Sequence, residues 1–210
     1  MSREYMHILR HVLALGSVMY PKFLVALSLL VAAGMTQTAV ADGYFLQADV
    51  GGQTQSLVGS AAHGPFSFGA NLTDYAGGRS GAITASYGYA LSGAVTFKVG
   101  PTIGFTKEDG RGTDVDAGAR VAIDRWSATS FGSTYWLAEA STPQQSWFLL
   151  GQMAFAPVNI GIELSRGGSD TYHETTLALQ RRIGEGQVSL RLGYKLSSDE
   201  VFAGFSINTF

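Results

Sequence analysis

The chain has 210 residues, among them 27 glycines, 5 prolines and no cysteine, and its formal net charge is −2. The lack of cysteine excludes disulfide frameworks, thiolate metal sites and cysteine nucleophiles, and the near-neutral charge gives no reason to expect nucleic acid as a partner. Beyond the N-terminal region, no apolar run reaches the roughly 18 residues that a membrane helix needs. Two fold classes remain, a soluble all-β domain and a membrane barrel with apolar residues at every second position.

The N-terminal region has the features of an export signal. Lys22 precedes the apolar segment 23–33, and Ala39-Val40-Ala41 forms a small-x-small cleavage site before Asp42. The apolar segment is too short to span a bilayer, which favours cleavage over anchoring. We therefore predict a signal peptide with an upstream extension over residues 1–41 and a mature domain over residues 42–210.

Apolar and polar residues alternate along most of the mature part. Successive side chains of a strand point to opposite faces, so each alternating segment has one apolar and one polar face. Alternation is clearest at 95–106, 114–124, 158–165 and 187–197. In chain order, the predicted strands cover 44–55, 66–76, 82–91, 95–106, 114–124, 130–141, 146–156, 158–165, 172–183, 187–197 and 201–209.

Short runs rich in Gly, Ser and Asp separate these segments, which predicts an antiparallel up-and-down meander. The raw count is eleven segments, whereas bacterial barrels have an even number of strands. The weakest segment is 130–141, because Tyr135, Trp136 and Leu137 break its alternation. We predict an all-β, antiparallel up-and-down transmembrane β-barrel of about ten strands, within a range of eight to twelve.

The polar faces favour a membrane barrel, in which polar side chains fill the lumen and apolar ones meet lipid. They carry charges of both signs, Asp49 among them, which suits a narrow lumen closed by ion pairs. We expect the basic members of a lumen charge network to point inward and to pair with its acidic members. The predicted network comprises Lys98, Asp114, Asp116, Arg120, Asp124, Glu163, Arg191 and Lys195.

Aromatic residues near the strand ends also fit a membrane barrel, because such residues form girdles at both membrane interfaces. A terminal aromatic such as Phe210 is typical of outer-membrane barrels. Val201, Phe205 and Ile207 lie on the opposite face from Phe210, however, which weakens this indication, although a bulge near the end of the last strand would reconcile the two observations. A soluble periplasmic β-barrel is the alternative.

The mature part contains one candidate catalytic group, His173 with Glu174 and Ser169. Lipid-modifying enzymes use an activated serine, usually with histidine as base. Adjacent strand residues point to opposite faces, so His173 and Glu174 are not expected to converge, and His63 lies in a predicted loop. We predict no enzymatic activity and no cofactor.

Two further clusters have more than one interpretation. Asp114, Asp116 and Asp124 share a face and could bind calcium through oxygen ligands, but a network with Arg120 is favoured, so no metal is predicted. In the basic pair Arg181-Arg182 the two members face opposite ways. One of them is a candidate contact for anionic lipid headgroups, and the alternative is an ordinary interface anchor.

Several short motifs resemble the BcsS family of outer-membrane proteins, which is associated with bacterial cellulose biosynthesis. They are Tyr87-Gly88-Tyr89 with Gly93 and Gly100, Ser141-Thr142 with Ser146-Trp147 and Leu150-Gly151, Gly161-Ile162-Glu163, Gly193-Tyr194 and the final Phe210. The family often has Gly-Pro-Glu where this chain has Gly161-Ile162-Glu163. The resemblance implies an accessory role in exopolysaccharide export and carries over no catalytic residue.

The predicted function is therefore a non-enzymatic role, structural, binding or accessory, in the outer membrane of a Gram-negative bacterium, with cellulose export as the implied process. The alternatives are a narrow channel for small solutes and a lipid-modifying enzyme. About ten strands would leave a lumen largely filled by side chains, which argues against bulk porin activity. The expected partners are outer-membrane lipid, the barrel assembly machinery and a polysaccharide or export complex.

Overall fold

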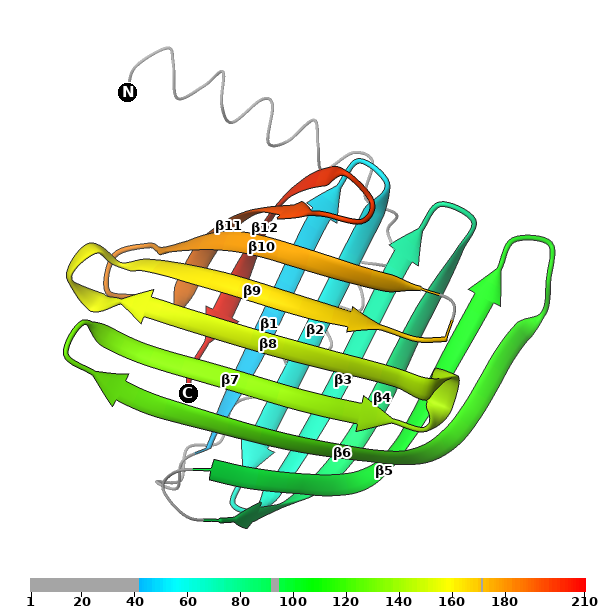
Figure 1. Ribbon diagram of the computed structural model, residues 1–210, viewed down its shortest axis with the longest axis horizontal. Helices are drawn as coiled ribbons and strands as arrows, with labels where there is room; N and C mark the ends of the chain where they lie inside the picture. The colour runs from blue at the N-terminus through cyan, green and yellow to red at the C-terminus, as the bar shows by residue number, and fades with distance from the viewer. Residues whose placement is uncertain (1–41, 92–94, 171) are drawn as a thin grey trace. The chain divides into compact units, whose positions relative to one another are not determined.

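The computed structural model describes residues 42–91, 95–170 and 172–210, and the predicted signal segment 1–41 lies outside them. The described residues form twelve antiparallel strands in one closed barrel (Figure 1). Each strand pairs with its neighbours in the chain, and β1 pairs with β12 to close the sheet. The all-β up-and-down fold is as predicted, with the strand number at the upper limit of the expected range.

The connections between strands are two to five residues long, and two of them contain a short 3-10 segment. None of the described residues belongs to a helix long and apolar enough to cross a membrane. The elements are β1 (Gly43–Gly51), β2 (Thr54–His63), β3 (Phe66–Tyr75), β4 (Gly78–Ala90), β5 (Val95–Glu108), β6 (Thr113–Thr129), β7 (Gly132–Ser141), η1 (Pro143–Gln145), β8 (Ser146–Phe155), η2 (Ala156–Val158), β9 (Ile160–Gly168), β10 (His173–Arg182), β11 (Val188–Lys195) and β12 (Glu200–Asn208).

The predicted number of about ten strands is too low, for two reasons. The predicted segment 44–55 contains a hairpin, in which Gly52-Gln53 joins β1 to β2. The sequence pattern does not reveal β2, because Gly59 and Ala61 stand at outward positions and differ little in hydrophobicity from their small inward neighbours. The doubtful segment 130–141 is a strand, β7, and its alternation breaks because Leu137 faces the lumen beside Asp124.

The two ends of the barrel differ in what they carry. We call the end where β1 begins and β12 ends the proximal end, and the end of the β1–β2 and β11–β12 connections the distal end. At the distal end the β5–β6 hairpin is longer than its neighbours: β6 pairs with β7 only from Arg120 onward, so residues 113–119 extend beyond β7. The distal opening is therefore uneven, with its highest wall at β5 and β6 (Figure 1).

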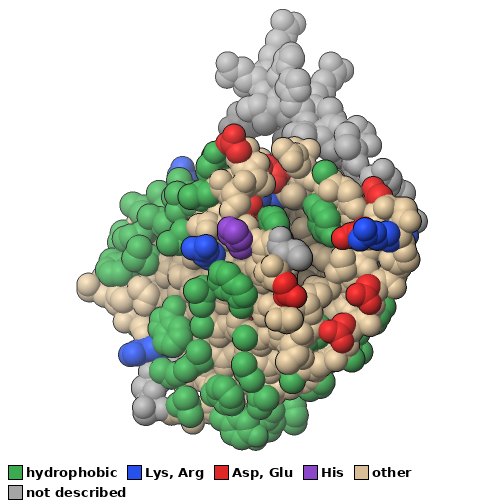
Figure 2. All heavy atoms as spheres, turned by 45° about the vertical axis from the view of Figure 1, so that its right-hand side comes forward, with side chains coloured by type: hydrophobic (Ala, Val, Ile, Leu, Met, Phe, Trp, Pro, Cys, Tyr) green, Lys and Arg blue, Asp and Glu red, His purple; other side chains and the backbone are tan. Residues whose placement is uncertain are grey.

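The register gives each strand one face toward the lumen and one toward the outside. Leu190 and Leu192 are more than half exposed on the outside, whereas Arg191 between them is buried inside. Figure 2 shows hydrophobic side chains gathered toward the left and lower margins of the view, away from a central hollow. This is the arrangement expected of a membrane barrel and the reverse of a soluble one.

The last strand has no bulge, so Phe210 does not share a face with the outward apolar residues of β12. β12 pairs without interruption with β1 and β11, which leaves Val201 and Ile207 outside and Ser206 inside. Phe210 instead lies over Gly43, where an added Cβ would be 2.6 Å from the ring Cδ1. The terminal aromatic thus occupies the space that a glycine leaves on β1.

Candidate functional site in the barrel lumen

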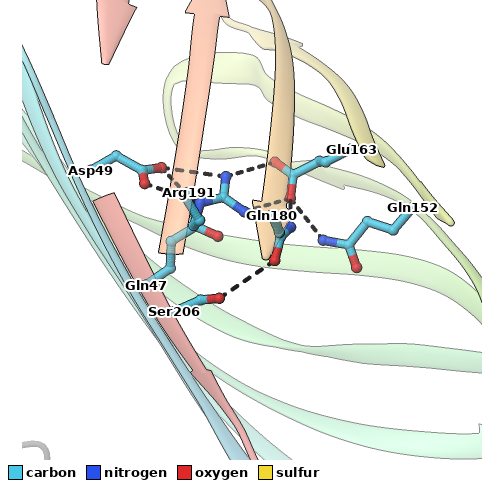
Figure 3. Close-up of polar contacts among 7 residues, drawn as sticks. All are labelled: Gln47, Asp49, Gln152, Glu163, Gln180, Arg191 and Ser206. Carbon is cyan, nitrogen blue, oxygen red and sulfur yellow. Dashed lines mark hydrogen bonds and ion pairs between the residues drawn. The ribbon is translucent and has the colours of Figure 1, made fainter. Parts of the chain in front are cut away.

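Arg191 on β11 forms the centre of a polar cluster inside the barrel (Figure 3). Its Nε donates to Oδ1 of Asp49 on β1 at 3.0 Å, and its Nη1 donates to Oε2 of Glu163 on β9 at 2.9 Å. The Arg191 side chain is 1% exposed, and the two carboxylate side chains are 7% exposed. A charge this deeply buried persists only when it is paired and hydrogen-bonded, and here both conditions are met.

Neutral amides complete the cluster. Asp49 Oδ2 accepts from Gln47 Nε2 at 2.7 Å, and Glu163 Oε2 accepts from Gln152 at 2.8 Å and from Gln180 at 3.0 Å. These donors supplement the single guanidinium, which is shared between two carboxylates. The formal charge of the cluster is therefore negative by one, and the charged and amide side chains come from five strands, β8, β9, β10, β11 and β1.

A second cluster lies on β4 to β7. Lys98 Nζ is 2.7 Å from Oδ2 of Asp124, which also accepts from the Tyr135 hydroxyl at 3.0 Å. Arg120 forms an ion pair with Glu139 and donates to Ser86 Oγ at 3.3 Å. Lys98 and Glu139 are each 26% exposed, so this cluster is more open to solvent than the one around Arg191.

A third cluster closes the distal side of the seam between β1 and β12. Glu200 is 3.2 Å from Lys195 Nζ and accepts from the backbone N–H of Thr54 at 2.8 Å. Its carboxylate also accepts from the Gln53 N–H and the Thr54 hydroxyl. This carboxylate thereby holds the short β1–β2 connection against β11 and β12.

Six of the eight residues in the predicted network form ion pairs in the lumen, namely Lys98, Arg120, Asp124, Glu163, Arg191 and Lys195. Asp114 and Asp116 form none with the described residues, contrary to expectation. They lie on the part of β6 that extends beyond β7, so Arg120 pairs with Glu139 across the β6–β7 ladder instead.

Three carboxylates of the clusters were absent from the predicted network: Asp49, Glu139 and Glu200. Asp49 shows the expected alternation, but nothing in the sequence identifies Arg191 as its partner. Glu139 belongs to the segment with irregular alternation, and Glu200 follows a run of turn-forming residues. Glu200 is the first residue of β12. Its neighbour Val201 faces outward, and this alternation is the sequence feature that places Glu200 on the lumen face.

The wall formed by β2, β3 and β4 differs from the charged one. Among the described residues of these strands, every lumen-facing side chain is neutral, and most are small. Asn71, midway along β3, shares the lumen face with Ser86 yet is solvent-exposed. β2–β4 lie behind β7–β9 in Figure 1, across the lumen. Solvent-accessible space therefore exists inside the barrel, beside the neutral wall.

The β7–β8 connection folds inward over the charged wall. Thr142 N donates to Ala119 O at 2.9 Å, and Ala119 N donates to Thr142 Oγ1 at 3.0 Å. Gln144 Nε2 lies 2.5 Å from Thr106 Oγ1 on β5. These contacts hold residues 142–145, which we call the inward loop, against the lumen side of β5 and β6.

Two glycines make room for the inward loop. A Cβ added at Gly118 would collide with Thr142 Oγ1 and lie 2.9 Å from Pro143 Cδ, and one added at Gly104 would lie 3.2 Å from Pro143 Cβ. Pro143 is buried, while Gln144 has a φ of 58°. A non-glycine residue in this left-handed region costs on the order of 1 kcal/mol. The loop contacts offset this cost, and the inward loop narrows the distal mouth.

Beside the inward loop is a cavity of about 360 Å³, lined by Asp114, Val115, Asp116, Thr142, Gln144, Gln145 and Asp170. Figure 2 shows acidic side chains beside the hollow on this face. Among the described residues, no three His, Asp or Glu side chains meet as a metal site would require. Asp124 lies with Lys98 rather than with Asp114 and Asp116, so the three aspartates of the calcium alternative do not converge.

The candidate catalytic group His173, Glu174 and Ser169 is not assembled either. Glu174 accepts from the N–H groups of Ser197 at 2.7 Å and Ser198 at 3.1 Å, so it caps the β11–β12 connection. His173 is exposed on the other face of β10. His63 lies 2.6 Å from Asp42 at the proximal end, in β2 rather than in a loop.

Tyr172 ties the β9–β10 connection to Glu174, to which its hydroxyl donates at 3.2 Å. Partial burial, the charge of Glu174 and this hydrogen bond together raise the pKa of Tyr172 to about 12. Burial and a neighbouring negative charge both disfavour the phenolate. Tyr172 is therefore a neutral hydrogen-bond donor over the physiological range, and Glu174 is a structural carboxylate.

Comparison with known proteins supports the architecture. No protein-family model matches the chain, and no curated protein matches it. The resemblance to the BcsS family thus has no matching family model behind it. Among solved structures, the chain is similar to a KdgM porin, with 12% sequence identity, a TM-score of 0.50, and coverage of 79% of this chain and 98% of that one. Identity this low shows a shared fold, a closed antiparallel β-barrel.

Proposed function

We propose that this protein is a narrow, water-filled channel for small polar solutes in the outer membrane. The proposal rests on one observation, that the two sides of the lumen wall differ in charge. Small neutral side chains on β2–β4 face the charged clusters across the lumen, and Asn71 on β3 is exposed to solvent there. Twelve strands also enclose a wider lumen than the ten first expected, since barrel diameter grows with strand number. The similar KdgM porin is in keeping with a channel.

The outer surface supports insertion into a membrane. Outward-facing aromatic residues form one girdle at each end: Tyr44, Phe66, Tyr87, Tyr89, Phe97, Phe131 and Phe155 at the proximal end, and Phe105, Trp147, Tyr172 and Tyr194 at the distal end. Such girdles sit at the two membrane–water interfaces. The strand residues with outward charge lie near strand ends: Asp74, Arg79, Lys107, Arg125, Arg166 and Arg181. At the bilayer midplane each Arg or Lys would cost roughly 2–4 kcal/mol.

The proximal end faces the periplasm in this proposal. An exported chain enters the outer membrane from the periplasm, and with an even number of strands both strand termini stay on that side. The predicted export signal at 1–41 fits this route. The distal end, with the inward loop and its acidic cavity, then faces the cell exterior.

The charge distribution favours cations. The Arg191 cluster is formally negative by one, and Asp114 and Asp116 at the distal mouth form no ion pair with the described residues. Fixed negative charge along a low-dielectric wall raises the local cation concentration. We therefore expect a small conductance with a preference for cations. The accessory role in exopolysaccharide export remains a prediction of the sequence resemblance alone.

Planar-bilayer recording of the refolded mature barrel tests the channel. The wild type should give discrete conductance steps, and Asn71→Trp should reduce them several-fold because the indole would enter the open space. Ala70→Trp is the matched control: Ala70 is the next residue on β3 but faces outward opposite Ile83. Absence of conductance in a folded wild-type barrel, or equal loss in both variants, would overturn the proposal.

A further inference from the structure

The outer surface has a shallow cavity of about 480 Å³ at the proximal end. It lies where the β8–β9 connection, the end of β10 and the start of β11 meet. Its lining combines apolar side chains with a basic pair and comprises Val158, Asn159, Arg181, Arg182, Ile183, Gly184 and Leu190. We call this cavity the Arg181 pocket.

Arg181 lies among apolar residues on the outer surface of the barrel. Its cross-strand partners are Ile160 on β9 and Leu190 on β11, both exposed on the outside of the barrel. Among the described residues it forms no ion pair, a property it shares with Arg125, Arg166 and Arg182, whereas Arg79, Arg111, Arg120 and Arg191 each have a carboxylate partner. A guanidinium with apolar neighbours on a lipid-facing surface is stabilised by an anion. The described barrel supplies none here.

The proximal aromatic girdle is interrupted at this place. Outward aromatic residues near the proximal end come from β1, β3, β4, β5, β8 and the β6–β7 connection. On the described residues of β9 to β12 the corresponding positions hold Ile160, Arg181, Val188 and Ile207. Interfacial aromatic rings sit at the level of lipid headgroups. At the headgroup level, strands β9 to β12 therefore carry the Arg181 guanidinium among aliphatic side chains in place of aromatic rings.

We propose that the Arg181 pocket binds the headgroup phosphate of an anionic phospholipid in the periplasmic leaflet. The planar guanidinium matches a phosphate with two parallel hydrogen bonds. Val158, Ile183 and Leu190, each more than half exposed, offer apolar surface to the glycerol and upper acyl chain. An anionic lipid is preferred because its phosphate lacks the compensating ammonium of a zwitterionic one. The inference rests on the proposed membrane insertion.

Native mass spectrometry of the mature barrel in detergent, titrated with dioleoyl phosphatidylglycerol or dioleoyl phosphatidylcholine, tests the pocket. The wild type should retain one phosphatidylglycerol in preference to phosphatidylcholine. Arg181→Gln should weaken that binding about tenfold, the range for hydrogen bonds to a charged group, and Arg181→Lys should weaken it less. Arg166→Gln is the matched control, since Arg166 also faces outward but lies near the distal end of β9. It should leave binding unchanged.

Three results would overturn the proposal: equal phosphatidylglycerol affinity of wild type and Arg181→Gln, equal loss in Arg166→Gln, or displacement of the lipid by millimolar inorganic phosphate. The last would assign the pocket to free phosphate. Flotation of the wild type with phosphatidylglycerol vesicles tests membrane insertion separately. A barrel that floats without conductance would defeat the channel and leave the lipid site standing, whereas a barrel that does not float would defeat both.

Discussion

Arg191 on β11 lies between Asp49 on β1 and Glu163 on β9 and donates hydrogen bonds to both carboxylates (Figure 3). The two carboxylates belong to strands on either side of β11, with β12 between β11 and β1 and with β10 between β11 and β9. A single side chain therefore bridges five adjacent strands across the seam that closes the barrel. This arrangement ties barrel closure to the pairing of charges in the lumen.

Replacing Arg191 should destabilise the barrel strongly. In Arg191→Leu, two carboxylates would remain buried without their shared cation, and breaking a buried ion pair in this way costs about 3–5 kcal/mol. Urea unfolding of the refolded barrel, followed by tryptophan fluorescence, measures the free energy of unfolding. Arg166→Leu, at an exposed outer position, is the control. Adding Asp49→Asn and Glu163→Gln to Arg191→Leu should recover part of the loss, and a loss below 1 kcal/mol in Arg191→Leu would contradict the role assigned to this cluster.

Displacing the inward loop should widen the distal mouth. In Gly118→Val, the new side chain would occupy the space of Thr142 and Pro143 and push residues 142–145 out of the lumen. We expect a larger single-channel conductance in planar bilayers. Gly112→Val is the control, because no neighbour lies within 4 Å of its Cβ position. An unchanged conductance in a folded Gly118→Val barrel would show that the loop does not limit ion flow.

Neutralising the distal carboxylates should reduce cation preference. Asp114→Asn with Asp116→Asn removes two negative charges from the cavity beside the inward loop. The reversal potential in a potassium chloride gradient should move toward zero, most clearly at low salt, where screening extends over about 10 Å or more. Glu185→Gln, which removes one negative charge from the proximal β10–β11 connection, is the control, and its shift is compared per charge removed. An equal shift in both would place selectivity elsewhere than the distal mouth.

Tyr172 should ionise near pH 12, about two units above an ordinary tyrosine. Because folding raises this pKa, the contribution of the neutral phenol to stability is complete below about pH 10 and is lost as the pH rises through about 12. The difference in absorbance at 295 nm between wild type and Tyr172→Phe measures this ionisation. Glu174→Gln should lower the pKa by removing the adjacent charge, and ionisation of Tyr172 near pH 10 in the wild type would rule out the contact with Glu174.

The protein should leave membrane lipids chemically unchanged. Glu174 accepts from the β11–β12 connection and His173 faces the other way, so Ser169, His173 and Glu174 do not form a nucleophile, base and acid. Mass spectrometry of lipid A and phospholipids should give the same species in cells with and without the protein. A lipid modification that required His173 but not His63, tested by His173→Ala and His63→Ala in folded barrels, would show that the protein is an enzyme.

The sequence by itself determined which residues of each regular strand share the outward face of the barrel. Leu190 and Leu192 alternate with Arg191, and period-two alternation sets opposite faces whatever the strand's neighbours are. It did not determine the number of strands, because a two-residue turn such as Gly52-Gln53 interrupts the alternation hardly at all. Only the strand pairing shows that β1 and β2 are separate strands. It also shows that β7 is a strand although Leu137 faces the lumen and breaks the alternation.

Partner choice was decided only by the tertiary structure. Asp49 and Arg191 are 142 residues apart, and they meet because β1 closes on β12 in one register. Arg120 pairs with Glu139 rather than Asp116 because the β6–β7 ladder begins at Arg120. Likewise, residues 142–145 fold inward because Gly104 and Gly118, on two other strands, leave room for Pro143. Each of these contacts depends on register and on space left by distant residues, and local alternation carries no information about either.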